Sequence, residues 1–279
     1  MIQHFSKMHG LGNDFIVLDA TLTPFDWSQE RIRALADRHT GIGFDQLLII
    51  ETAPAAHIDF AYRIFNRDGG EVEHCGNGAR CFAKYVFDHG MASRERPLRV
   101  AVKKGLIDIH YAGEADGSEQ YRVNMGSPDF TPFTAEQNSV LNQAIPLDGD
   151  TRHFGIVSMG NPHAVTTYRD VFTAGDDIAR IGSALQQHPL FPERVNVGFM
   201  DIIDRTHIHL RVYERGVGET QACGTGACAA AAIGIAQGAL DAHVHVTLPG
   251  GTLRIDWAGD DSPLYMTGAA QTVYHGQLP

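Results

Sequence analysis

The segment YERGVGETQACGTGA, residues 213–227, contains a cysteine, a Gly-x-Gly turn and the start of an apolar run that reaches Ala236. The run from Ala227 to Ala236 is rich in good helix formers and nearly all apolar, which predicts a buried helix. Cys223 would then lie at the helix entrance, where backbone N–H groups have no partner within the helix. Because the positive end of the helix dipole favours a thiolate, we expect the pKa of Cys223 to be lowered toward neutrality.

The same arrangement occurs 148 residues earlier, around Cys75. In the 18 positions from 62 to 79, eight residues match their counterparts at this offset, where unrelated segments would share roughly one. The matching residues of the earlier segment are Arg63, Arg67, Gly70, Glu71, Cys75, Gly76, Gly78 and Ala79. A repeat this long indicates a duplicated domain. We therefore expect two similar halves related by a pseudo-twofold axis, each presenting one cysteine.

The length of 279 residues accommodates two domains of about 100–150 residues each. We place an N-terminal domain carrying Cys75 at residues 1–120, with a C-terminal strand at about 264–279 returning to it, and a second domain carrying Cys223 at 121–263. Helices are expected at 28–38, 78–88 and 175–187, and strands at 15–18, 47–50, 58–65, 98–103, 106–111, 120–125, 154–159, 164–167, 207–213, 243–248, 252–257 and 264–274.

Composition excludes several classes of protein. A formal net charge of -11 argues against a general nucleic-acid binder, which needs a basic surface. The most apolar run is too short to span a bilayer, and the start of the chain has no secretory pattern, so we expect a cytoplasmic protein with no membrane partner. The cysteine spacings, C-x5-C and C-x4-C, do not match a metal site. Cys81 and Cys228 are expected to be buried helical residues.

Two cysteines at two helix N-termini favour a particular chemistry. The expected symmetry would place both at a common cleft, with free backbone N–H groups aimed at one anion. A substrate carbon between them can lose its proton to a thiolate on one face, and the planar carbanion that forms can take a proton from a thiol on the other face. The pattern therefore predicts a two-base racemase or epimerase, and no lysine lies in a motif typical of pyridoxal phosphate enzymes.

Five motifs together resemble diaminopimelate epimerase, nearly end to end and in the same order. They are MHGLGNDF at 8–15, GFDQ at 43–46, EHCGNGARC at 73–81, MGNPH at 159–163 and the segment 213–227. The resemblance implies an α/β (α+β) fold of two domains, each a curved, mostly antiparallel sheet or barrel around a central helix. It also implies cofactor-independent interconversion of LL- and meso-diaminopimelate, on the route to lysine and peptidoglycan.

The resemblance also implies roles for particular residues. Cys75 and Cys223 would be the acid and base, with His163 and Glu214 assisting at the reacting centre. The residues implied to bind substrate are Asn13, Gln46, Asn66, Gly76, Asn77, Asn161, Asn196, Glu214, Arg215, Gly224 and Thr225. These roles suit a substrate with two amino-acid ends. Arg215 offers two parallel donors to a carboxylate, and Glu214 can accept from an ammonium group.

Three alternatives stay open at this point. A proline racemase-like or hydroxyproline epimerase-like enzyme would keep both cysteines but lose the polar residues Asn66, Asn196 and Arg215 that suit a second amino-acid end. A non-catalytic amino-acid-binding protein would have no need for both cysteines and both Gly-x-Gly turns. A dithiol redox protein would depend on a disulfide. The sequence does not define the oligomeric state, and a homodimer is one option.

Overall fold

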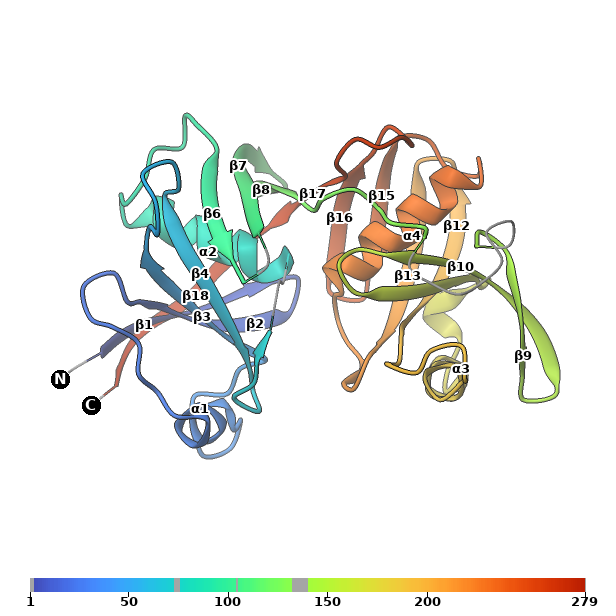
Figure 1. Ribbon diagram of the computed structural model, residues 1–279, viewed down its shortest axis with the longest axis horizontal. Helices are drawn as coiled ribbons and strands as arrows, with labels where there is room; N and C mark the ends of the chain where they lie inside the picture. The colour runs from blue at the N-terminus through green and yellow to red at the C-terminus, as the bar shows by residue number, and fades with distance from the viewer. Residues whose placement is uncertain (1–2, 73–75, 104, 132–139, 279) are drawn as a thin grey trace. The chain divides into compact units, whose positions relative to one another are not determined.

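The computed structural model describes residues 3–72, 76–103, 105–131 and 140–278, and no helix in these ranges is long and apolar enough to cross a bilayer. The chain divides into two compact units (Figure 1). The first unit is Met1–Asn124 with Thr267–Pro279, and the second unit is Met125–Met266. Strands dominate both units and helices are few, so the fold is of the α+β class, as the sequence predicted.

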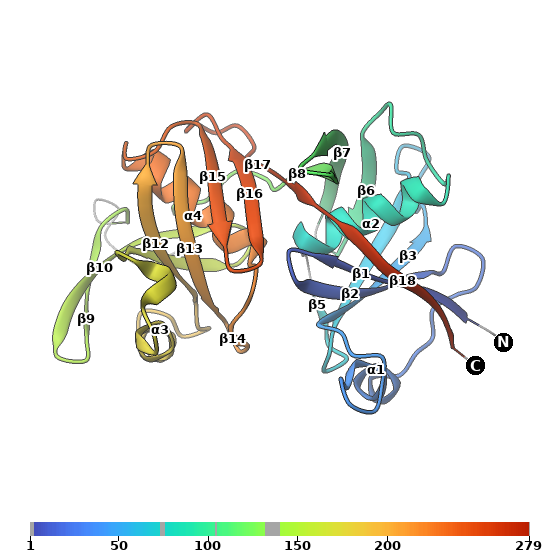
Figure 2. The ribbon, with the colours of Figure 1, turned by 180° about the vertical axis from the view of Figure 1, so that it is seen from behind.

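The first unit is built from a curved mixed sheet. Its strands are β1 (Gln3–Gly10), β2 (Asn13–Asp19), β3 (Gln46–Thr52), β4 (Phe60–Asn66), β5 (Glu71–Val72), β6 (Leu98–Val102), β7 (Gly105–Ala115), β8 (Ser118–Asn124) and β18 (Gln271–Leu278). Neighbours pair antiparallel except β2 with β3 and β4 with β6, which are parallel. The sheet surrounds helix α2 (Gly76–Asp88), which Figure 2 shows from behind.

The second unit repeats this pairing pattern. Its elements are β9 (Gln143–Leu147), β10 (Asp150–Ser158), β11 (Pro162–Thr167), η1 (Val171–Thr173), α3 (Asp177–Gln186), β12 (Asn196–Asp204), β13 (His207–Glu214), β14 (Gly218–Glu219), α4 (Gly224–Ala236), β15 (His243–Leu248) and β16 (Gly251–Asp256). The steps β11 to β12 and β13 to β15 are parallel, in the places of β2 to β3 and β4 to β6. Both central helices have 13 residues, and Gly224 follows Gly76 by 148 positions. The duplication is therefore visible in topology as well as sequence.

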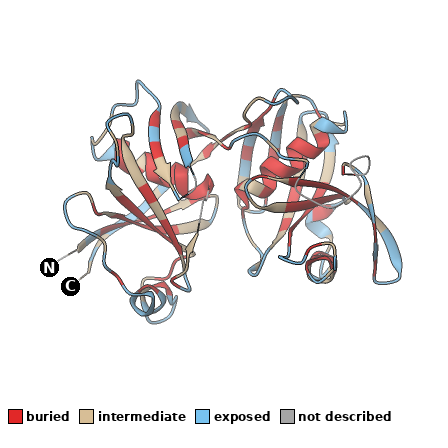
Figure 3. Ribbon diagram, in the orientation of Figure 1, coloured by how far each residue is buried: buried red, intermediate tan, exposed pale blue. Residues whose placement is uncertain are grey.

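Both central helices are buried, and Figure 3 shows them almost wholly in the buried colour. Helix α4 is apolar on every face, which suits a helix enclosed by a sheet. Helix α2 differs in that it contains buried polar residues, among them the fully buried Arg80. Its Nε donates to the carbonyl of Ala269 at 3.1 Å, and such a bond is needed because a buried charge without partners is costly. Ala269 ends β17 (Tyr265–Ala269), a strand that pairs with β8.

Most predicted elements are present, with shifts at their ends. Helix α1 (Gln29–Ala36) begins after Ser28, whose side chain accepts from the Arg31 N–H as expected of a cap. The single strand predicted at 264–274 is wrong, because the chain forms two strands, β17 and β18, with a break at Ala270.

Strand β1 was not predicted as a strand. Its sequence mixes polar and apolar residues, yet Ser6 and Lys7 are buried with their apolar neighbours. It continues to Gly10 and joins β2 through a two-residue hairpin at Leu11 and Gly12, where φ is +56° and +82°. Positive φ at both positions is typical of the tight turn that best matches strand twist. The Gly-x-Gly at residues 10–12 is therefore a hairpin turn.

Candidate active site

Cys223 caps the N-terminus of α4 and is only 5% exposed. Its carbonyl accepts the first intrahelical bond, from the Ala227 N–H at 2.9 Å. Gly226 leaves room for the thiol, because a Cβ at that position would lie 3.2 Å from Cys223 Sγ and 2.9 Å from Val212 Cγ2. The second glycine of the Gly-x-Gly turn is therefore required by the close approach of the cysteine side chain and of β13.

The prediction of a lowered pKa for Cys223 is wrong for this structure. Burial raises the pKa of the thiol well above its ordinary value, and the nearby Glu214 carboxylate raises it further through its charge and a hydrogen bond. Bonds from the Gly226 N–H and the Thr225 hydroxyl act in the opposite direction but do not prevail. Desolvation outweighs the helix terminus because the thiolate would lose nearly all its hydration. Cys223 is therefore a protonated thiol at neutral pH in this structure.

A chain of polar contacts leads from His163 to Cys223. His163 Nε2 lies 3.0 Å from Asn161 Oδ1, and Asn161 Nδ2 donates to Thr225 Oγ1 at 3.4 Å. Thr225 Oγ1 lies 3.7 Å from Cys223 Sγ. Since the amide oxygen only accepts, the imidazole donates through Nε2. The Thr225 oxygen accepts from Asn161, so its own proton is available to the sulfur.

His163 is a neutral imidazole in this structure. It lies fully buried on β11, and burial together with the charge of Arg215 lowers its pKa to about 3. With Nε2 engaged by Asn161, the lone pair of Nδ1 has no hydrogen-bond partner among the residues that the structure describes. His163 can therefore accept a hydrogen bond through Nδ1, and it is not an imidazolium at neutral pH.

The side chain of Asn196 links the start of β11 to the end of β13, next to the polar contacts between His163 and Cys223. Its Nδ2 donates to the Pro162 carbonyl at 3.1 Å, and its Oδ1 accepts from the Arg215 N–H at 2.9 Å. The carboxylate of Glu214, which ends β13, accepts from the Thr220 hydroxyl. The second unit thus gathers a carboxylate, a guanidinium-bearing turn, a neutral imidazole and a thiol within one network, which suits binding of a zwitterion.

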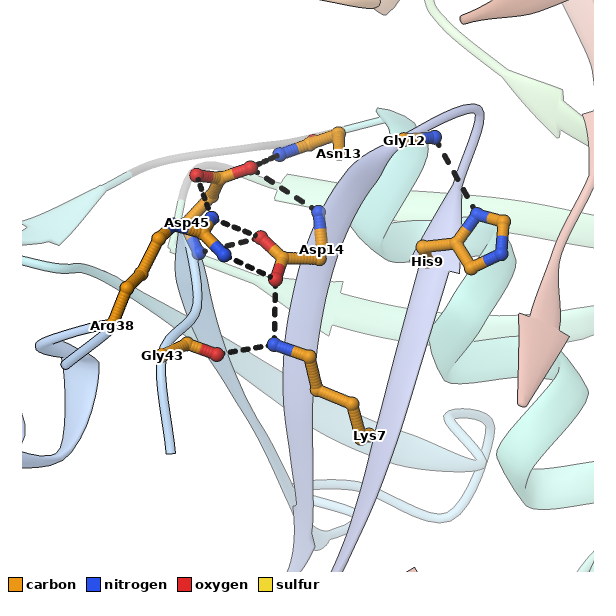
Figure 4. A network of polar contacts seen from close by, with 8 residues as sticks. All are labelled: Lys7, His9, Gly12, Asn13, Asp14, Arg38, Gly43 and Asp45. Carbon is orange, nitrogen blue, oxygen red and sulfur yellow. Dashed lines mark hydrogen bonds and ion pairs between the residues drawn. The ribbon is translucent and has the colours of Figure 1, made fainter. Parts of the chain in front are cut away.

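The first unit brings its own predicted ligands together. Gln46 and Asn66 are direct partners across β3 and β4, and Gln46 Nε2 donates to Asn66 Oδ1 at 2.8 Å. Asn13 Oδ1 accepts from Asn77 Nδ2 at 3.3 Å. Asn13 also donates to Asp45, as Figure 4 shows. Four of the predicted substrate ligands therefore form two hydrogen-bonded pairs on the strands and helix start of this unit.

Not every predicted residue is placed. Cys75 lies outside the described residues. Gly76 and Gly224 are the first residues of α2 and α4, and both are buried. In the described ranges, no group of three His, Cys, Asp or Glu side chains is positioned to hold a metal ion.

Sequence reasoning missed two side chains that hold the predicted ones. Asp45 binds Asn13, and Thr220 binds Glu214. Both belong to the recognised motifs GFDQ and YERGVGET, which was the available signal. Asp45 is 32 residues from Asn13, and Thr220 is six residues from Glu214. The helix and strand periodicity of the sequence therefore does not identify either contact.

Solved structures share this fold across their whole length. A hydroxyproline epimerase from Agrobacterium vitis, with bound trans-4-hydroxy-L-proline, superposes with a TM-score of 0.71 at 17% identity, covering 99% of this chain and 92% of that one. A phenazine biosynthesis protein of the PhzF family from Bacillus anthracis gives 0.70 at 15% identity, covering 100% and 99%. The chain therefore has the diaminopimelate epimerase-like fold.

Sequence comparison narrows the class to one family. Residues 5–131 and 155–273 match the diaminopimelate epimerase family. A relative from Chromobacterium violaceum, described as diaminopimelate epimerase, is 53% identical over 278 residues and covers 98% of each chain. The chain belongs to the diaminopimelate epimerase family.

Proposed function

We propose that the protein interconverts LL- and meso-diaminopimelate without a cofactor, using Cys75 and Cys223 as the two acid–base groups. The proposal includes a place in lysine and peptidoglycan precursor synthesis, and a cytoplasmic setting that keeps both thiols reduced. One observation supports it most. Cys223 caps the N-terminus of α4, where hydrogen-bond donors of the first helical turn act on its thiol. The sequence repeats this arrangement at Cys75, directly before α2. The 53% identity to a diaminopimelate epimerase supports the choice of substrate.

The reaction divides the work between the two sulfurs. In one direction the Cys75 thiolate takes the α-proton, so that the Cα–H bond breaks and an S–H bond forms. The electron pair left on Cα is delocalised into the carboxylate, and the Cys223 thiol then gives its proton to the opposite face. The raised pKa of Cys223 supports its starting role as acid in this direction, and the reverse direction exchanges the roles.

The backbone would hold the charge that develops. The backbone N–H groups of Gly76, Asn77, Gly224 and Thr225, in the first turns of α2 and α4, would bind the reacting carboxylate, because helix N-termini favour anions. Donors fixed before the reaction stabilise the growing negative charge at little reorganisation cost. His163 and Glu214 would position the reacting amino acid through Nδ1 and the carboxylate.

The remaining ligands suit the second amino-acid end of the substrate. Arg215 would bind its carboxylate, and the amides of Asn13, Gln46, Asn66, Asn161 and Asn196 supply uncharged donors and acceptors. The two hydrogen-bonded pairs, Asn13 with Asn77 and Gln46 with Asn66, fix amide directions before substrate arrives. A proline-like substrate has no second end to use these groups.

We also propose a homodimer. Strand β18 carries two large exposed side chains, Val273 at 57% and Tyr274 at 44%, and exposed apolar groups on a strand are candidates for pairing with a second copy. Sedimentation equilibrium of the wild-type chain and of Tyr274→Lys tests this. A monomeric wild type would contradict it.

Proton NMR of LL-diaminopimelate in deuterated water with reduced enzyme tests the proposed reaction. We expect deuterium at one α-position with conversion to the meso form. Exchange of proline or hydroxyproline instead would move the substrate to the sister racemases, and silence with every amino acid would favour a binding protein. Cys75→Ala and Cys223→Ala should each abolish conversion, while Cys228→Ala, a buried change in α4, should retain it. Full activity of either of the first two variants would reject the two-cysteine mechanism.

A further inference from the structure

Asp45 joins two separate segments of the first unit (Figure 4). It lies between the loop after α1 and the start of β3, and its Oδ2 accepts from Asn13 Nδ2 at 3.0 Å and from the Asp14 N–H at 3.2 Å. The backbone N–H of Asp45 in turn donates to the Asp14 carbonyl at 3.0 Å. The loop and the β1–β2 hairpin are therefore held in register at the position of Asn13.

The carboxylate also decides which end of the Asn13 amide faces which neighbour. An ionised carboxylate only accepts hydrogen bonds, whereas an amide has one accepting and one donating end of nearly equal size. The NH₂ group of Asn13 must therefore face Asp45, which turns Oδ1 toward Asn77 Nδ2, 3.3 Å away. A neutral amide in place of Asp45 would allow the opposite orientation.

Two cations bind this pair of carboxylates. Arg38 donates to both oxygens of Asp14, at 2.7 and 3.0 Å, and to Asp45 Oδ1 at 2.8 Å. Lys7 donates to Asp14 Oδ2 at 2.5 Å and to the Gly43 carbonyl. Burial alone would raise the pKa of Asp14, but the bonds from Arg38 and Lys7 lower it to about 2. Because Arg38 is half exposed, these ion pairs add little to the free energy of unfolding. They do fix the orientation of the Asp14 and Asp45 carboxylates.

The backbone of Asp45 extends the same control to two more predicted ligands. Its carbonyl accepts from the Arg67 N–H at 3.1 Å, next to Asn66. Its neighbour Gln46 donates to Asn66 Oδ1 at 2.8 Å. Asp45 thus lies where the positions of Asn13, Gln46 and Asn66 are set together.

We infer that Asp45 is a positioning residue, whose carboxylate fixes the amide of Asn13 with its oxygen toward Asn77 so that Asn13 meets the substrate in one orientation. The inference rests on the proposed function for the role of Asn13 in binding diaminopimelate. The carboxylate of Asp45 is engaged by Asn13, Asp14 and Arg38, so we expect its effect on the reaction to pass through Asn13.

A double-mutant cycle tests that dependence. Asp45→Asn keeps the size of the side chain but removes the charge that selects the orientation. We expect it to raise KM for LL-diaminopimelate by about tenfold, with a smaller change in kcat. In an Asn13→Ala background the same change should cost less than about twofold, because the acting group is already gone. Asp37→Asn, in the same loop but bonded only within it, should leave KM unchanged. Independent, multiplicative losses at the two sites would overturn the inference.

An NMR measurement separates this inference from the proposed function. The side-chain amide protons of Asn13 are assigned by their loss in Asn13→Ala. In Asp45→Asn we expect them to shift and to exchange faster with water, and in Asp37→Asn to stay as in the wild type. If they do not move in Asp45→Asn, the inference fails. A wild type inactive on diaminopimelate would instead reject the proposed function and leave this spectroscopic outcome to decide the orientation.

Discussion

Asn13 and Asn161 occupy equivalent places 148 residues apart, yet they turn opposite ends of their amides toward the helix start. Asn13 accepts from Asn77, whereas Asn161 donates to Thr225, and each bond spans 64 residues of chain. The residue at the other end of each amide sets its orientation. The carboxylate of Asp45 can only accept from Asn13, whereas the imidazole of His163 donates to Asn161. Duplication has therefore kept the scaffold and changed the polarity of the contact.

Thr225 is expected to tune Cys223 through its hydroxyl. The hydroxyl accepts from Asn161 and bonds to Cys223 Sγ, which lowers the pKa of the thiol. Thr225→Val should therefore raise that pKa, and Thr225→Ser should restore it. The check is the pH dependence of Cys223 alkylation by iodoacetamide, followed by peptide mass spectrometry. Equal midpoints for Thr225→Val and the wild type would contradict the contact.

Glu214 is expected to have the opposite effect. Its carboxylate raises the pKa of Cys223 by its charge and by accepting from the thiol. Glu214→Gln removes the charge at nearly constant size, so alkylation of Cys223 should reach its midpoint at a lower pH. Epimerisation should fall at the same time, because the carboxylate is proposed to bind an ammonium group. An upward shift of the midpoint would show that the loss of packing outweighs the loss of charge.

His163 should make stability depend on pH. Its pKa is about 3 in the folded protein and 6.5 in its ordinary state. Both states hold it neutral at pH 7, but below pH 6.5 the unfolded chain gains a proton that the folded chain does not take until about pH 3. The stability present above pH 6.5 is therefore lost as pH falls.

Urea unfolding of the wild type and of His163→Gln at pH 7 and pH 5 measures this effect. Between these values the free energy of unfolding of the wild type should fall by about 2 kcal/mol more than that of the variant. Other histidines are common to both proteins and cancel in the comparison. Asp14, whose pKa is also lowered, acts only below its ordinary value of 3.8. Equal falls in the two proteins would mean that His163 is accessible to protons when folded.

Gly226→Ala should damage both packing and chemistry. The added methyl would press on Val212 and on Cys223 Sγ, and overpacking of this kind costs about 1–3 kcal/mol. We expect a lower midpoint in urea and a loss of epimerisation greater than the loss of folded protein at the assay temperature. Wild-type activity in this variant would show that the thiol has room that the structure does not provide.

The amino-acid sequence by itself determined the features that depend on neighbours along the chain. The repeat around Cys75 and Cys223, the Ser28 cap, the central helices and the strand at 207–213 all follow from local composition and spacing. These signals are local because a helix start or an alternating strand is specified within a few residues. Strand β1 could not be predicted from local sequence, because Ser6 and Lys7 are buried by the sheet around them.

Only the tertiary structure decided the protonation and direction of the functional groups. Cys223 has a raised pKa and His163 a lowered one because the folded chain removes both from water. Asn13 points its oxygen at Asn77 because Asp45, 32 residues away in sequence, presents a carboxylate to its other end. Desolvation and the choice of hydrogen-bond partner are set by residues far apart in the chain, so they come into being only when the fold brings those residues together.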